Sequence, residues 1–275
     1  MEKINGRFAY ENGCVYEGDL VDGVRTGRGK MIYPAGNVYE GDWLNDKCHG
    51  KGRCVYFNGD VYEGDWLNDM RHGKGEFVYA DGGIYNGDWK NGKPHGKGKR
   101  VFPDGRIYEG DWVKGSVEGI GKYTISSGDV YEGEFLDGEY KGKGRCVYAN
   151  GDIYEGDYAA GVRHGKGRYI YADGDIYEGD WLNDKAHGKG RCVYANGGIY
   201  EGDYADGVRH GKGRLVCADG DIYEGDWLNG KAHGKGRYIY ADGRVEDGWF
   251  ENGCFKDGMT YNVEVNNISF KREWF

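Results

Sequence analysis

The stretch YEGDWLNDKAHGKGR, residues 177–191, is one copy of a unit that recurs along most of this chain. Each copy opens with a tyrosine, and successive tyrosines are 23 residues apart without insertion, at Tyr16, Tyr39, Tyr62, Tyr85, Tyr108, Tyr131, Tyr154, Tyr177, Tyr200 and Tyr223. If that tyrosine is position 0, glycine occupies positions 2, 11, 13 and 20 in every copy. A period of this length indicates a repeat architecture.

The composition indicates β-structure. Glycine numbers 54, tyrosine 25 and tryptophan 8 among 275 residues, and this combination favours short strands joined by tight turns. The segments DIYEGDW (175–181) and GRYIYA (167–172) alternate as strands do, and ADGD (172–175) is typical of a hairpin turn. We therefore predict an all-β protein, an elongated single-layer antiparallel sheet built as a meander of about twenty strands.

The repeat also predicts a strand register. We interpret LNDKAHGK (182–189) as a second, longer loop and pair position 0 with position 17 across both connections. This register places the aromatic residue of position 4 over the glycine of position 13, so that a ring covers bare backbone. On the other face it sets the acid of position 3 opposite the base of position 14, and position 1 opposite position 16.

The YEGDWLNGKAHGKG unit (223–236) at this period resembles the MORN repeat, named for membrane occupation and recognition nexus. The resemblance covers about residues 6–245 and implies a twisted or curved single-layer sheet. We expect residues 1–245 to form this sheet and residues 246–275 to form a degenerate repeat and a terminal cap. Since catalysis in enzymes of the family resides in a separate domain, the resemblance leaves no room for one here.

The histidines and the GKG motif do not form a recognisable active site. All seven histidines occupy position 10, one in each of seven copies, so neighbouring copies lie too far apart to share a zinc ion. Asn183 stands where a Walker loop needs its first glycine, and Gly190 where it needs a hydroxyl. The acidic spacing does not fit an EF-hand. We expect no catalytic residue, no cofactor and no metal site.

The charge pattern offers one candidate surface. The formal net charge is −9 with both signs interspersed, which excludes nucleic acid as a general partner. Basic residues nevertheless recur in the expected long loops and would form a basic edge facing anionic lipid head groups or a partner. The candidate residues are Lys51, His72, Lys74, His95, Lys97, His164, Lys166, His187, Lys189, His210, Lys212, His233 and Lys235.

The aromatic residues offer a second candidate surface, a groove of partly exposed rings over glycine. Most of these rings must form the core of the sheet, and a subset would receive a helix or an extended peptide. Its candidates are Tyr39, Trp43, Tyr62, Trp66, Tyr85, Trp89, Tyr108, Trp112, Tyr177, Trp181, Tyr223 and Trp227. A third candidate lies near the C-terminus, where Phe270, Trp274 and Phe275 would form an association surface that supports a homodimer.

These patterns lead to one functional prediction and one alternative. We expect a non-catalytic scaffold or spacer that binds other proteins, in a cytoskeletal, ciliary or other large assembly. The alternative is a peripheral membrane protein that binds anionic phospholipid or phosphoinositide. Seven cysteines, an odd number, without a secretion signal favour an intracellular, cytoplasmic location.

Overall fold

The computed structural model describes residues 2–263, and these form 23 β-strands and no helix. The chain divides into two compact units, residues 1–139 and 140–275. The strands of the first unit are β1 Lys3–Ala9, β2 Val15–Val21, β3 Val24–Ile32, β4 Val38–Leu44, β5 Lys47–Val55, β6 Val61–Leu67, β7 Met70–Val78, β8 Ile84–Lys90, β9 Lys93–Val101, β10 Ile107–Val113, β11 Ser116–Thr124 and β12 Val130–Leu136. Those that follow are β13 Glu139–Val147, β14 Ile153–Ala159, β15 Val162–Ile170, β16 Ile176–Leu182, β17 Lys185–Val193, β18 Ile199–Ala205, β19 Val208–Val216, β20 Ile222–Leu228, β21 Lys231–Ile239, β22 Arg244–Glu251 and β23 Cys254–Asn262.

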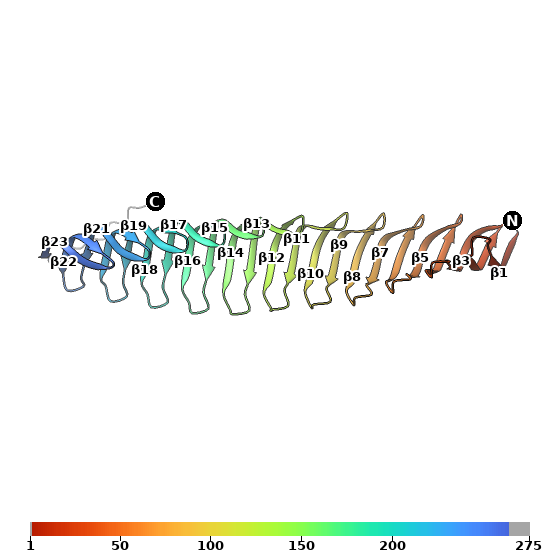
Figure 1. Ribbon diagram of the computed structural model, residues 1–275, viewed down its shortest axis with the longest axis horizontal. Coiled ribbons are helices and arrows are strands. Elements are labelled where there is room, and N and C mark those ends of the chain that lie inside the picture. Colours follow the sequence, from red (N-terminus) through yellow and green to blue (C-terminus); the bar gives the residue numbers. More distant parts are fainter. Residues whose placement is uncertain (1, 264–275) are drawn as a thin grey trace. The chain divides into compact units, whose positions relative to one another are not determined.

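Within each unit the sheet is a plain meander. Inside a unit, consecutive strands pair antiparallel, as β4 does with β3 and β5, and β17 with β16 and β18. Figure 1 shows consecutive strands lying side by side in chain order within each unit. The prediction of an all-β, single-layer antiparallel sheet is confirmed, with 23 strands where about twenty were expected.

The segment interpreted as a long loop is instead a tight turn followed by a strand. Leu182 faces Lys185, and the two residues between them, Asn183 and Asp184, have φ values of 47° and 66°. Two successive positive φ values define the type I′ turn, whose twist matches that of the flanking strands. The prediction of a loop over 182–189 is therefore wrong, because β17 begins at Lys185.

The register differs from the predicted one by two residues. Tyr177 faces Cys192 at position 15 rather than position 17, and the neighbouring strand repeats this pairing, with Cys192 opposite Tyr200. The other connection explains the shift, because it has five residues, 194–198, closed by hydrogen bonds from Tyr194 N to Gly198 O and from Gly197 N to Tyr194 O. A bulge between Gly179 and Trp181 absorbs the difference between the two turns.

Rings do cover glycine, but the ring belongs to position 0. A Cβ atom added to Gly190 would lie 2.6 Å from Cε2 of Tyr177, in the same repeat. Trp181, at position 4, instead donates from Nε1 to the carbonyl oxygen of Gly167 in the preceding repeat at 3.1 Å. Aromatic cover of glycine is confirmed, and the assignment of that cover to the position-4 residue is wrong.

The core of each unit is a chain of edge-to-face ring contacts. Tyr62, which is fully buried, contacts Trp66 of its own repeat and Trp89 of the next, each with ring centroids 5.2 Å apart. Edge-to-face pairs of this kind stabilise beyond the area that they bury. The hydroxyl of Tyr62 donates to the carbonyl oxygen of Asp65 at 2.8 Å, and all ten position-0 tyrosines make the same bond. Burial raises the pKa of Tyr62 well above its usual value, so the donor stays protonated.

Candidate partner-binding surfaces

The twelve rings predicted to line an open groove are instead the core. All are buried, none exposing more than 8% of its surface: Tyr39, Trp43, Tyr62, Trp66, Tyr85, Trp89, Tyr108, Trp112, Tyr177, Trp181, Tyr223 and Trp227. Each tyrosine packs between aromatic rings of its own and the following repeat and has its hydroxyl satisfied by backbone. The prediction that a subset of these rings lines an exposed groove is therefore wrong, because none of the twelve is exposed.

The lysines of position 12 lie on strands and are paired with aspartates. Lys51 Nζ lies 2.5 Å from Asp65 Oδ1, because position 12 faces position 3 of the next repeat in the observed register. Lys235 is different, since its cross-strand neighbour is Trp249. The lysine–aspartate pair seen in Lys51 and Asp65 recurs at 2.5–2.6 Å for Lys74–Asp88, Lys97–Asp111, Lys166–Asp180, Lys189–Asp203 and Lys212–Asp226.

The predicted pairing of position 3 with position 14 is wrong. Position 14 pairs with position 1, as in Arg145–Glu155 at 2.8 Å.

The histidines lie at the bulge of each long strand. His72 faces Asp65 across the strands, and its Nδ1 is buried without a hydrogen-bond partner. His95 Nδ1 accepts a long bond from the backbone N–H of Lys114. His164, His187, His210 and His233 occupy the equivalent place in β15, β17, β19 and β21. Over residues 2–263, no three His, Cys, Asp or Glu side chains come together as a metal site would require.

The aspartate–lysine pairs should make stability fall in acid. Lys97 holds the pKa of Asp111 below its ordinary value of 3.8, although partial burial acts in the opposite direction. Because the folded-state pKa is the lower one, the contribution is complete above the unfolded pKa and is lost as the pH falls through the folded value. The pKa is lowered likewise at Asp65, Asp88, Asp157, Asp180 and Asp203.

We expect urea midpoints to be similar at pH 7 and pH 5 and to drop between pH 4 and pH 2. At about 0.2–1 kcal/mol for an exposed pair, six pairs produce a measurable loss. Asp111→Asn should lower stability slightly at pH 7 and weaken the acid dependence. A midpoint that is unchanged at pH 2 would contradict this account.

Arginine at position 9 covers the core in four repeats, a feature that the sequence did not reveal. Arg71 Cζ lies 4.5 Å from the ring centroid of Trp89, and its Nη2 donates to the carbonyl oxygen of Gly92 at 2.8 Å. Such contacts between a cation and a ring are attractive and shield the ring from water. Arg25, Arg163 and Arg209 cover Trp43, Trp181 and Trp227 at 4.3–4.6 Å. The recurrence of arginine at position 9 in four copies is the sequence signal that could have indicated this cover.

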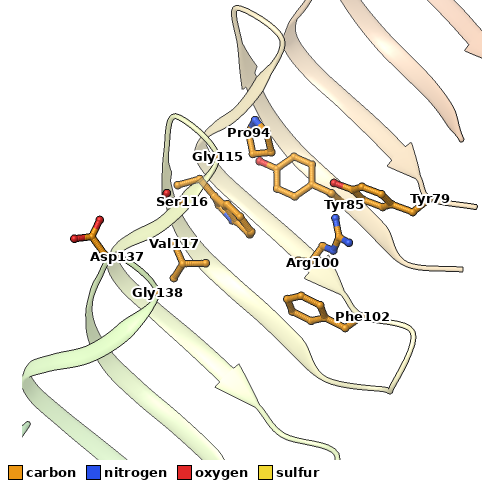
Figure 2. A pocket seen from close by; sticks show the side chains of 11 residues that line it. Tyr79, Tyr85, Pro94, Arg100, Phe102, Gly115, Ser116, Val117, Asp137 and Gly138 are labelled. Atoms are coloured by element: carbon orange, nitrogen blue, oxygen red, sulfur yellow. The ribbon is translucent and has the colours of Figure 1, made fainter. Parts of the chain in front are cut away.

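A hollow of about 430 Å³ opens in the first unit where this cover is missing. Position 9 is Pro94 in the fourth repeat and Val117 in the fifth, and both line the hollow. Figure 2 shows Arg100 between Tyr79 and Phe102 on one side of the hollow and Asp137 at the opposite end. The remaining lining residues are Tyr85, Trp112, Gly115, Ser116 and Gly138.

The last described hairpin continues the repeat pattern in altered form. Phe250 of β22 takes the place of the position-4 ring, is buried, and contacts Tyr223 with centroids 5.1 Å apart. Trp249 and Met259 are exposed by 49% and 67%. The residues predicted as an association surface, Phe270, Trp274 and Phe275, lie outside the described residues.

Hairpins that repeat every 23 residues and bury the same set of rings define a tandem-repeat protein. The MORN repeat model matches ten times in tandem, at residues 16–38, 39–61, 62–84, 85–105, 108–130, 131–153, 154–176, 177–199, 200–222 and 223–243. This chain belongs to the MORN-repeat family, and the predicted resemblance is confirmed.

Comparisons with whole proteins show weaker similarity than the repeat model does. None of the curated proteins matches the chain. Among solved structures, the TCP10 domain of Danio rerio CPAP in complex with a peptide of STIL is 14% identical, with a TM-score of 0.42 over 95% of this chain and 100% of that chain. The TCP domain of Drosophila melanogaster SAS-4 in complex with a proline-rich motif of Ana2 is 16% identical, with a TM-score of 0.28 over 71% and 86%. Both similarities are too low to support an argument about function. In residues 2–263, no helix has the length and apolarity to cross a membrane.

Proposed function

We propose that the protein is a non-catalytic intracellular scaffold or spacer that binds other proteins through its repeat sheet, in a cytoskeletal, ciliary or similar large assembly. The repeated residues support this, because they already make contacts that hold the fold together. Tyrosine and glycine lie in the core, and aspartate and lysine form cross-strand pairs. The residues that differ between copies are left to provide specific contacts.

The observation that carries the proposal is a row of exposed apolar side chains beside the two-residue turns. At position 5 these side chains are 40–45% exposed in Leu44, Val113, Leu136, Leu182 and Leu228. Apolar residues repeated along one edge, within each unit, offer a protein partner a surface to bury.

Affinity purification after mild cross-linking, from the cell that makes the protein, tests this proposal. We expect discrete partner proteins to be recovered with the wild-type chain and to be reduced when Leu182 and Leu228 are both replaced by serine. Replacing the exposed Ala172 and Ala195 at the five-residue turns by serine is the matched control. Recovery of no specific protein by the wild-type chain would contradict a scaffold.

The peripheral-membrane alternative makes a separate prediction. Since the position-12 lysines are neutralised by aspartate, we expect little binding to phosphoinositide vesicles even at low salt. The double change Asp65→Asn and Asp88→Asn frees Lys51 and Lys74 and should increase vesicle binding in a flotation assay. Strong, salt-sensitive flotation of the wild-type chain would instead favour the membrane role.

A further inference from the structure

The hollow in the first unit lies where the arginine cover over one tryptophan is absent. Trp112 would be covered by position 9 of the fourth repeat, but that residue is Pro94. The carbonyl of Gly115, which matches the one that accepts from Arg71 at Gly92, lines the hollow instead. Position 9 is Val117 and Tyr140 in the next two repeats, so three successive copies lack the arginine. Trp112 keeps 7% of its surface exposed, against 3–5% for the four tryptophans that arginine covers.

Arg100, in the wall of this hollow, has no ion pair with any residue of 2–263. It occupies position 15, where each of the other nine repeats has an uncharged residue. Its Cζ lies 3.6 Å from the ring centroid of Tyr79 and 5.3 Å from that of Phe102. Its Nε is buried, and no residue of the described chain accepts a hydrogen bond from it. A buried donor without an acceptor is rare in native proteins and calls for an explanation.

Comparison of the repeats shows which carboxylate is absent beside the Nη2 end of this guanidinium. Asp152 and Asp221, both at position 21, accept hydrogen bonds from the position-15 tyrosine of the following repeat, at 2.6 Å from Tyr169 and 2.8 Å from Tyr238. The residue that corresponds to these aspartates before Arg100 is Gly83. A Cβ atom built on Gly83 would lie 3.3 Å from Nη2 of Arg100. The same Cβ would lie 3.1 Å from Oδ1 of Asp81 and 3.4 Å from Cδ of Pro103, so a side chain fits there once these neighbours shift by a few tenths of an ångström. Five of the ten repeats have aspartate at this position, and the third repeat does not.

The surrounding charge favours an anionic occupant. The fourth repeat, residues 85–107, carries four lysines and two arginines against Asp88 and Asp104, in a chain whose net charge is −9. Lys90, Lys93 and Lys99 have no ion pair with any residue in the described part, and they lie on the opposite face of the single-layer sheet from Pro94 and Arg100. A local positive field of this kind increases the association rate of an acidic partner.

We propose that this hollow binds an extended acidic segment of a partner protein. An aspartate or glutamate carboxylate of the segment occupies the place left by Gly83 and accepts from Arg100. A neighbouring apolar side chain covers Trp112 between Pro94 and Val117. Asp137, at the opposite end of the hollow in Figure 2, disfavours a second carboxylate there and so sets the order of acidic and apolar residues. The inference rests on the proposed scaffold function and names one of its binding sites.

Three substitutions test the site, and each copies a residue found at the same position in another repeat. Gly83→Asp supplies an internal carboxylate to Arg100 and should compete with the segment, whereas Gly198→Asp makes the same change where position 15 of the next repeat is Leu215. Arg100→Leu removes the cation as repeat nine does. Pro94→Arg supplies the missing cover over Trp112, and it closes the hollow while adding positive charge.

The probe is a displayed library of random 12-residue peptides, selected on the full 275-residue chain. We expect selected peptides to contain an acidic residue next to an apolar one, and to bind in a fluorescence-polarisation assay. Gly83→Asp, Arg100→Leu and Pro94→Arg should each weaken binding about tenfold or more, since a charge-assisted bond or the apolar contact is lost. Gly198→Asp should leave binding unchanged, and acid-to-amide changes in the peptide should abolish it.

Several outcomes overturn the proposal. One is selection of peptides without acidic residues, or of peptides that the three variants bind as well as the wild type does. In the second case the scaffold function stands and only this site is lost. If no peptide is selected while affinity purification still recovers partners, only the proposed site is contradicted. If peptide selection and affinity purification both fail, the scaffold function is contradicted as well. Arg100-dependent binding to phosphatidylserine vesicles with no peptide binding would assign the hollow to lipid.

Discussion

Replacing Tyr62 by alanine should destabilise the first unit by about 3–5 kcal/mol, the usual cost of removing a large buried aromatic side chain. Tyr62 is fully buried, contacts Trp66 and Trp89, and donates its hydroxyl to the carbonyl oxygen of Asp65. The substitution removes all of these contacts and uncovers Gly75. Urea unfolding followed by tryptophan fluorescence measures the change.

Two further substitutions separate the contributions of Tyr62. Tyr62→Phe keeps the ring contacts and loses only the hydroxyl donor, so it should cost about 1 kcal/mol. Leu44→Ala changes a side chain that is 43% exposed and should cost less than half of the Tyr62→Ala effect. A loss below about 1 kcal/mol for Tyr62→Ala would show that the ring chain does not hold the sheet together.

Replacing Gly75 by alanine should cost about 3 kcal/mol or more, from one added methyl group. Its backbone is outside the left-handed region, so alanine brings no conformational penalty there. The new Cβ would lie 2.6 Å from both Cε2 and Cζ of Tyr62, and the ring has no free space to move into. The upper range for overpacking a core applies because the neighbour is a rigid, buried ring. Urea unfolding again provides the measurement.

A matched glycine and a double mutant make this prediction specific. Gly92 has φ +80° and no atom within 4 Å of an added Cβ, so Gly92→Ala should cost only the conformational penalty of about 1–2 kcal/mol. Combining Gly75→Ala with Tyr62→Ala should cost clearly less than the sum of the two, because the methyl group enters the space that the ring leaves. Additive effects would disprove contact between this ring and this glycine.

The period, the fold class and the two faces of the sheet could be predicted from the sequence. The actual register differs from the predicted one by two residues, and a shift of two keeps every side chain on its face. For this reason ring cover of glycine was anticipated correctly while the covering ring was misassigned. The same parity explains why acids and bases were expected to face each other, although Asp65 pairs with Lys51 at position 12 and not with position 14.

The register itself depends on turn types that the sequence shows only in part. Asn91-Gly92 and Asn229-Gly230 carry the dipeptide typical of a type I′ turn, but Asn183-Asp184 adopts the same positive φ values without glycine. The four residues after such a turn, rich in Lys and His, resemble a loop when the turn is missed. The bulge that follows also has no pattern in the residue types that would reveal it.

Errors in the register carried through to the predicted surfaces. In the predicted register, position 12 had no acidic partner, and its lysines formed a free basic row. The place of Gly83 beside Arg100 was equally hidden, because it appears only when position 21 of one repeat is compared with position 15 of the next. The arginine cover was missed as well, because only four of the ten copies have arginine at position 9.

Because each hairpin touches only its neighbours along the chain, the gene can change copy number without redesigning what remains. Loss of residues 177–199, for example, would join Ile176 to Tyr200 and restore the Ile–Tyr step found at Ile199–Tyr200. Duplication of one copy would leave every other hydrogen-bonded partner in place. A protein built in this way can change its length by whole repeats. It gains a distinct surface when a single copy changes, as the fourth copy has changed.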